Sequence, residues 1–235
     1  MAAAKKRKHA DTVSDVKRIL SDVKQRRFKP VYLLHGEEPY YIDLLTDALA
    51  EGVLDEDQRD FNQSVFYGQD TEPSHVANMA RQYPVMAPYQ VIIVKEAQVW
   101  KKWDDLIAAV KKPAETTVIV INVKGKSIDK RLAFYKEALK TAEVFESLKL
   151  TDRDVVPWTE QMCRSRKLEI DPRAAALMAE YIGADLGRLS SAVDKLSLMC
   201  KDAGKITTGD VSEHIGISKD FNIFELNRAI GMRDH

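Results

Sequence analysis

Short runs of apolar residues alternate with amphipathic segments of helical length through residues 1–150, and this alternation constrains the fold more than any other feature of the chain. The runs at residues 91–94 and 118–121 are apolar at every position. Strands that lack an alternation of apolar and polar residues are typical of parallel sheets covered by helices on both faces. The pattern therefore predicts an α/β fold with a central parallel sheet and connecting helices.

The expected elements follow from the spacing of the apolar residues. Strands are expected near residues 31–34, 61–67, 91–94, 116–123 and 144–148, and helices at 12–23, 39–53, 74–83, 103–112 and 129–141. After residue 150 only helical spacing continues, at 152–166, 172–182, 186–200, 208–215 and from 222 to the end. The sequence thus predicts an α/β domain over residues 1–150, whose first part, 1–27, is an N-terminal helix and basic tail, and a separate small all-helical domain after it.

Composition and spacing exclude several classes of protein. The 36 Lys and Arg balance the 36 Asp and Glu, so the molecule as a whole is not built to attract a polyanion. No apolar run approaches the ~20 residues of a membrane helix, and the basic residues 5–8 precede no apolar segment of a secretory signal. Cys163, Cys200 and the five histidines show no metal-ligand spacing. A cytoplasmic protein without a metal, a membrane segment or a disulfide is expected.

The loop after the first strand is the usual phosphate-binding position of such a sheet. Here it contains Gly36, Glu37 and Glu38, which are one glycine and two carboxylates without a lysine. After the strand at residues 91–94, Lys95 stands where a carboxylate would hold magnesium, and strand alternation turns Glu96 to the opposite face. The sequence therefore predicts a degenerate phosphate loop that binds no nucleotide. It also predicts that the chain has no cofactor, and no catalytic residue can be named.

The segment YPVMAPY at residues 83–89 is an apolar connection where polar turn residues are usual. Apolar loop residues are either buried under the fold or offered to a partner, and the composition of this segment alone favours burial. If the segment is exposed, Val85 and Met86 between Pro84 and Pro88 would form a preorganised plug. Each of the two side chains would then contribute ~1.5–3 kcal/mol when buried in a pocket of the partner.

Several segments taken together resemble the delta subunit of the bacterial DNA polymerase III clamp loader. In the α/β part the likeness rests on VYLLHGEEPYYI (31–42), FYG (66–68), PVM (84–86) and QVIIV (90–94). In the helical part it rests on Trp158 and on residues 181–189, 194–196, 206–207, 210–211 and 221–226. The order of these segments matches the family over roughly residues 28–235.

The resemblance implies a P-loop-NTPase-like (AAA+) first domain, a lid-type helical domain over residues 151–217 and the start of a helical collar domain at 218–235. It implies a subunit of the DNA polymerase III holoenzyme that has no activity of its own, binds the sliding clamp (the beta subunit) and opens this ring for DNA. In the family, two consecutive hydrophobic residues enter a pocket of the clamp. These positions are Val85 and Met86 here, whereas relatives more often carry leucine and phenylalanine.

The resemblance also implies contacts of the collar with the delta prime and gamma/tau subunits. Because the chain ends within what resembles the first collar helix, it is not expected to build the loader pentamer by itself.

Two other functions are compatible with the residues. A nucleotide-dependent transferase with an unusual phosphate loop would use Lys95 or residues 124–126, and ATP binding would favour it. A nucleic-acid-binding adaptor would use residues 5–8 together with a second basic group, and steeply salt-dependent DNA binding would favour it. That second group consists of Lys124, Lys126, Lys130 and Arg131. The same four residues could also face DNA within the loader, or they could simply be the solvated start of a helix.

Overall fold

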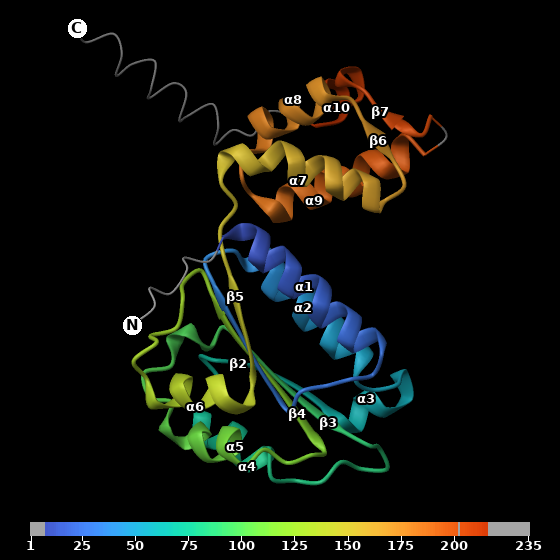
Figure 1. The fold of residues 1–235 in the computed structure, drawn as a ribbon. Coiled ribbons are helices and arrows are strands. Elements are labelled where there is room, and N and C mark those ends of the chain that lie inside the picture. Colours follow the sequence, from blue (N-terminus) through green and yellow to red (C-terminus); the bar gives the residue numbers. More distant parts are fainter. Residues whose placement is uncertain (1–7, 202, 216–235) are drawn as a thin grey trace, which may run out of the picture. The chain divides into compact units, whose positions relative to one another are not determined.

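The computed structural model of the chain describes residues 8–201 and 203–215. The chain divides into two compact units, Met1–Lys149 and Leu150–His235 (Figure 1). The helix expected from residue 222, the collar domain at 218–235 and the basic residues 5–7 lie outside the described residues. Each unit is considered below by itself.

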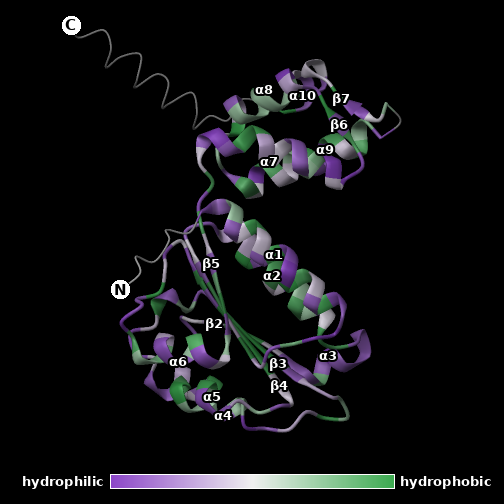
Figure 2. Cartoon of the chain, in the orientation of Figure 1, coloured by the Kyte–Doolittle hydropathy of each residue, from purple (hydrophilic) through white to green (hydrophobic). Residues whose placement is uncertain are grey.

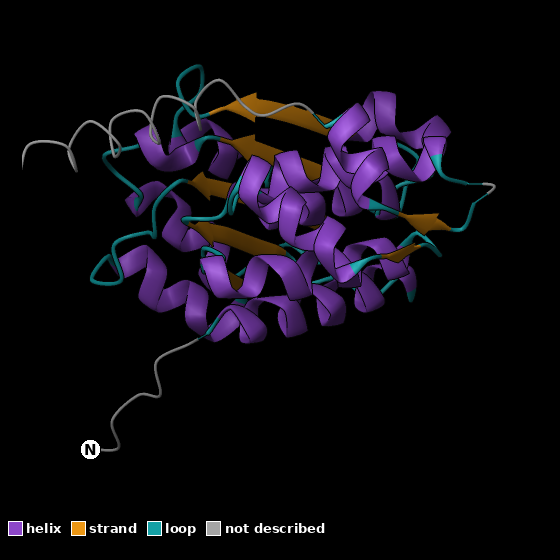
Figure 3. Ribbon diagram, turned by 90° about the horizontal axis from the view of Figure 1, so that it is seen from above, coloured by secondary structure: helices purple, strands orange, loops and turns teal. Residues whose placement is uncertain are grey.

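The first unit is built on a five-stranded sheet in the order β2-β3-β4-β1-β5, with every neighbouring pair parallel. Figure 3 shows strands of this sheet side by side. The strands are β1 (Val31–Gly36), β2 (Gln63–Tyr67), β3 (Gln90–Lys95), β4 (Thr117–Lys124) and β5 (Glu143–Ser147). The predicted parallel α/β fold is therefore confirmed.

Helices cover both faces of this sheet, which is why the inner strands β1, β3 and β4 are buried along almost their whole length and are mostly apolar. On one side lie α1 (His9–Lys24) and α2 (Pro39–Gly52), and on the other lie α4 (Pro73–Met79), α5 (Ile107–Lys111) and α6 (Ala133–Thr141) (Figure 1). The remaining helical elements are the short helix α3 (Glu56–Asn62) before β2 and the 3-10 turns η1 (Ala97–Val99) and η2 (Asp104–Leu106).

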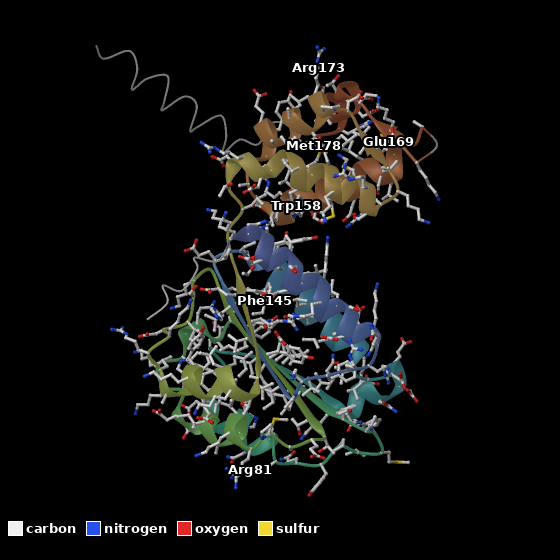
Figure 4. The ribbon with its side chains drawn as sticks, viewed as in Figure 1. Arg81, Phe145, Trp158, Glu169, Arg173 and Met178 are labelled. Carbon is white, nitrogen blue, oxygen red and sulfur yellow. The ribbon has the colours of Figure 1, made fainter. Side chains whose placement is uncertain are left out.

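The core of the first unit lies between the sheet and these helices. Figure 2 shows hydrophobic strands flanked by helices whose outer faces are hydrophilic. On the α4, α5 and α6 side, the strands contribute Leu33, Ile92 and Ile121, which pack in one cluster with Phe134 and other buried helix residues. Phe145 of β5, labelled in Figure 4, is 1% exposed.

The edge of β5 is closed by α1. The Thr12 hydroxyl donates to the carbonyl of Glu146 at 3.2 Å and accepts from the amide of Leu148 at 3.3 Å. Arg18 of the same helix forms a bidentate pair with Glu143. These contacts satisfy polar groups that an uncovered edge strand would leave for another chain to pair with.

The second unit is mainly helical, as predicted. It contains α7 (Asp152–Ser165), α8 (Pro172–Ile182), α9 (Leu186–Met199) and α10 (Thr208–His214). Trp158 and Met178, labelled in Figure 4, are 8% and 0% exposed and belong to its interior. Two parallel two-residue strands, β6 (Glu169–Ile170) and β7 (Lys205–Ile206), were not expected from the sequence, because a pairing this short leaves no period-2 pattern.

Three further details differ from the sequence-based expectation. Residues 61–62, expected as the start of a strand, instead end the helix α3, whose first turn carries acidic residues that suit the positive end of a helix. The helix expected at 129–141 begins only at Ala133, because Asp129 bonds Arg131 locally. Segment 103–112 is a 3-10 turn followed by a five-residue helix, and Pro113 opposes its continuation.

Among the described helices, none is long and apolar enough to cross a membrane.

Candidate functional site: an exposed apolar loop

The loop between α4 and β3 presents its apolar residues to solvent. Met86 is 98% exposed, Tyr83 is 85% exposed and Val85 is 58% exposed. The burial favoured by composition alone is therefore wrong. Proline fixes its own φ angle and keeps the preceding residue extended, so Pro84 and Pro88 oppose folding of the loop back onto the core.

The middle of the loop is tied to the end of α3. The side-chain amide of Asn62 accepts a hydrogen bond from the backbone N–H of Val85 at 2.6 Å and donates to the Val85 carbonyl at 3.0 Å. The same Asn62 nitrogen also donates to the carbonyl of Gln58 at 3.0 Å, within α3. Both backbone polar groups of Val85 are thus satisfied by one side chain, and the next residue, Met86, adopts a left-handed conformation with φ of 52°.

The two ends of the loop are also anchored. The buried side chain of Gln90, the first residue of β3, donates from Nε2 toward the carbonyls of Gln82 and Met79 and toward Thr117 Oγ1. Gln82 directly precedes the loop, so one side chain joins its start to its end. Tyr89 packs edge-on against Phe28 with ring centroids 5.7 Å apart. The tip is therefore held by contacts at its base and its middle while its apolar side chains face solvent.

The degenerate phosphate loop uses its own backbone donors internally. Gly36 N–H donates to the carbonyl of Lys126 at 3.2 Å, and the amides of Glu37 and Glu38 donate to the carbonyl of Ser147 at 3.0 and 3.4 Å. The buried Glu38 carboxylate accepts from the amide of Tyr40 at 3.0 Å and caps α2. In a phosphate loop such N–H groups would hold an anion, whereas here they are bonded to main-chain carbonyls.

The position after β3 is not arranged as a magnesium site. Lys95 ends the strand, and Glu96 lies in the left-handed region with φ of 59°, where it begins the turn η1. Within residues 8–201 and 203–215, no group of three His, Cys, Asp or Glu side chains could hold a metal ion.

The four basic residues considered as a DNA-facing group lie around the carboxyl ends of β1, β4 and β5, where three of them are paired with carboxylates. Lys124 contacts Asp43 of α2. Lys130 contacts Glu146 at 2.9 Å, and Arg131 contacts Asp129 at 2.8 Å. The main-chain carbonyl of Lys126 accepts a hydrogen bond from the Gly36 N–H.

Two of these ion pairs lower the pKa of their carboxylates. Burial acts to raise the pKa of Glu146, but the hydrogen bond and charge of Lys130 outweigh it and leave this pKa below its ordinary value. Hydrogen bonds from Arg131 lower the pKa of the exposed Asp129 to about 2. Both carboxylates are therefore ionised at neutral pH and offset part of the positive charge that a phosphate backbone would attract.

The two cysteines are buried and not suited to nucleophilic chemistry. Burial raises the pKa of the Cys163 thiol to about 11, and burial also raises that of Cys200.

Because the thiolate is the reactive form, we expect a thiol reagent at pH 8 to leave Cys163 unmodified in the native chain and to label it on unfolding. Absorbance from a disulfide reagent, with and without denaturant, measures this. Rapid labelling of the native chain would contradict the assignment of Cys163 as structural.

Sequence reasoning did not identify Asn62 or Gln90. Asn62 lies 23 residues from its loop partner, and no local pattern marks a contact between segments so far apart. Only the polar side chain of Gln90 at the start of an otherwise apolar strand gave a signal, because buried polar groups need partners.

Comparisons with known proteins agree with the fold and with the order of these segments. The family described as "DNA polymerase III, delta subunit" matches residues 32–148. The curated DNA polymerase III subunit delta of Bacillus subtilis is 24% identical over 222 residues, which cover 90% of this chain. Among solved structures, the Bacillus subtilis DNA clamp loader delta protein superposes with a TM-score of 0.73 at 25% identity, over 90% of this chain. The Thermotoga maritima RuvB Holliday junction branch migration motor gives 0.49 at 12% identity, over 88% of this chain and 68% of its own.

The chain is shorter than the relatives that it matches. It spans 64% of the curated delta subunit and 65% of the chain in the solved delta structure.

Proposed function

The chain belongs to the family of DNA polymerase III delta subunits, and from this premise we propose that it binds the sliding clamp through Val85 and Met86 and opens the ring for DNA. In this proposal the chain has no enzymatic activity and works in the cytoplasm as part of the polymerase III holoenzyme. The delta prime and gamma/tau subunits would be its neighbours in the clamp loader, and it would meet DNA through the complex.

The observation that carries the proposal is the exposure of Met86 on a tethered loop. A methionine that is 98% exposed gains the full free energy of burial, ~1.5–3 kcal/mol, when it enters an apolar pocket. Its flexible thioether also adapts to irregular pockets. Pro84 and Pro88 flank the pair and limit the conformational freedom that binding would remove. Calorimetric titration of the clamp with this chain tests the proposal.

Ring opening requires that the chain bind the open clamp more tightly than the closed one, since a ligand shifts an equilibrium only by its differential affinity for the two states. In the proposed mechanism the plug supplies the binding energy, and the rigid α/β unit that holds the loop bears against the clamp. No ATP is consumed by this chain, so hydrolysis would have to come from other loader subunits.

The internally bonded phosphate loop supports the absence of nucleotide binding. We expect 1 mM ATP with magnesium to change the melting temperature of the chain by less than about 1 °C. A site with a Kd of about 10 μM would stabilise the chain by about 2.7 kcal/mol, which corresponds to about 5–10 °C for a domain of this size. A shift of that size in a thermal melt would contradict the proposal and favour the transferase alternative.

The DNA-binding alternative is not favoured by the charges. Lys124, Lys130 and Arg131 each contact a carboxylate, so the group presents less net positive charge than the sequence suggested. We therefore propose that DNA contact, where it occurs, depends on the assembled loader.

A further inference from the structure

Asn62 is the only side chain identified among the described residues that hydrogen-bonds the backbone of the exposed tip, Val85–Met86. We infer that Asn62 is a positioning residue: its carboxamide sets the conformation in which Val85 and Met86 meet their partner. The inference rests on the proposed function and assigns a role to a residue outside the plug itself.

The contact between Asn62 and Val85 is a pair of hydrogen bonds from one buried side chain to both backbone polar groups of one residue. Asn62 is 5% exposed, and its oxygen and nitrogen contact the N–H and the carbonyl of the same residue, Val85, at 2.6 and 3.0 Å. A carboxamide offers one acceptor and two donors in a fixed plane, so it can pair with the N–H and the carbonyl of one residue as a neighbouring strand would. Its second donor can be directed to Gln58, which fixes the side chain to its own helix. The position of the tip is therefore fixed by α3 as well as by the two ends of the loop.

The hydrogen bonds of Asn62 to Val85 also constrain the backbone of the next residue, Met86. A non-glycine residue at φ of 52° is in a sparsely populated region, and such residues persist only where the surroundings hold them. The residue before it is Val85, whose two backbone polar groups are both bonded to Asn62. Without these bonds, Val85 can rotate and Met86 can relax to common backbone angles, which would redirect its side chain. Binding would then have to restore the lost conformation at the expense of affinity.

The experiment is a double-mutant cycle on the 235-residue chain, with titration of the sliding clamp from the same organism by calorimetry. We expect Asn62→Ala to weaken binding by about tenfold, the effect of two hydrogen bonds worth about 0.5–1 kcal/mol each. In a Met86→Ala background, the same change is expected to cost less than about threefold, because there is no longer a side chain to direct. Such coupling between residues without a shared chemical step is the mark of positioning.

Two further variants separate positioning from loss of fold. Asn78→Ala removes an exposed asparagine from the neighbouring helix α4 and is expected to bind as the unaltered chain does. Asn62→Asp keeps the acceptor for the Val85 N–H but places a carboxylate oxygen against the Val85 carbonyl, so it is expected to bind as weakly as Asn62→Ala. Amide exchange measured by NMR gives a readout without the clamp: Val85 should exchange slowly in the unaltered chain and quickly in Asn62→Ala.

The outcomes distinguish this inference from the proposed function. If Asn62→Ala is folded and binds the clamp normally while Met86→Ala does not bind, the plug stands and the positioning role of Asn62 is wrong. Additive effects of Asn62→Ala and Met86→Ala would also overturn it. If neither the unaltered chain nor any variant binds, the proposed function itself has failed, and slow exchange of the Val85 amide would then describe only a structural tether.

Discussion

Replacing both Val85 and Met86 by aspartate is expected to weaken binding of the sliding clamp by more than about 100-fold. Burial of two apolar side chains contributes about 3–6 kcal/mol at most, and loss of 3 kcal/mol alone corresponds to more than 100-fold in affinity. The carboxylates add a desolvation cost in an apolar pocket. Because the two side chains are exposed, at 58% and 98%, the substitution should leave the fold intact. Calorimetry measures affinity, and circular dichroism checks folding.

A matched control lies in the second unit. Leu198 and Met199 are likewise consecutive and exposed, at 80% and 52%, near the end of α9. Aspartate at both positions changes charge and hydropathy by similar amounts but should leave clamp binding within about twofold of the unaltered chain. Equal loss in the two double variants would indicate a nonspecific charge effect. If the unaltered chain fails to bind at tens of micromolar, the clamp-opening proposal is wrong.

The sheet could be predicted from the sequence because a strand that is buried on both faces needs apolar residues at consecutive positions. Residues 91–94 and 118–121 are apolar at every position, and both fall in inner strands of the parallel sheet. The two carboxylates of Glu37 and Glu38 beside Gly36 were evident in the sequence, and they oppose an anion by charge alone. The structure adds that their amides bind the carbonyl of Ser147, a contact across 110 or so residues that no local pattern reveals.

The exposure of the plug could not be predicted from the residues alone. Composition favours burial of an apolar loop, and one of the contacts that hold the exposed loop, that of Val85 with Asn62, comes from a helix that the sequence did not predict. The ion pairs of the basic residues could not be predicted for a similar reason. Their charge was evident, but the partners of Lys124 and Lys130 are Asp43 and Glu146, which lie on other elements. Pairing between distant segments is a property of the fold rather than of a sequence window.

Gly36 ends β1 where this strand approaches the end of β5, and Gly36→Ala should destabilise the first unit severely. A Cβ atom there would lie 2.0 Å from the Ser147 carbonyl oxygen and 2.7 Å from the Ser147 nitrogen, and φ is +140°. Backbone strain costs about 1–3 kcal/mol, and forced displacement of packed atoms costs about as much again. A loss of about 4 kcal/mol should lower the melting temperature by about 8–16 °C, which thermal unfolding followed by circular dichroism measures.

Gly125→Ala provides the comparison that separates crowding from strain. Gly125 also has a positive φ, +76°, but a Cβ atom there would meet nothing within 4 Å. Only the left-handed conformation is penalised, at about 1 kcal/mol, so its melting temperature should fall by about 2–4 °C. If the two variants melt alike, close approach of Ser147 is not what requires glycine at position 36. If Gly36→Ala alone is strongly destabilised, this glycine serves the junction of β1 and β5, where the carbonyl of Ser147 takes the amide donors that a nucleotide would otherwise use.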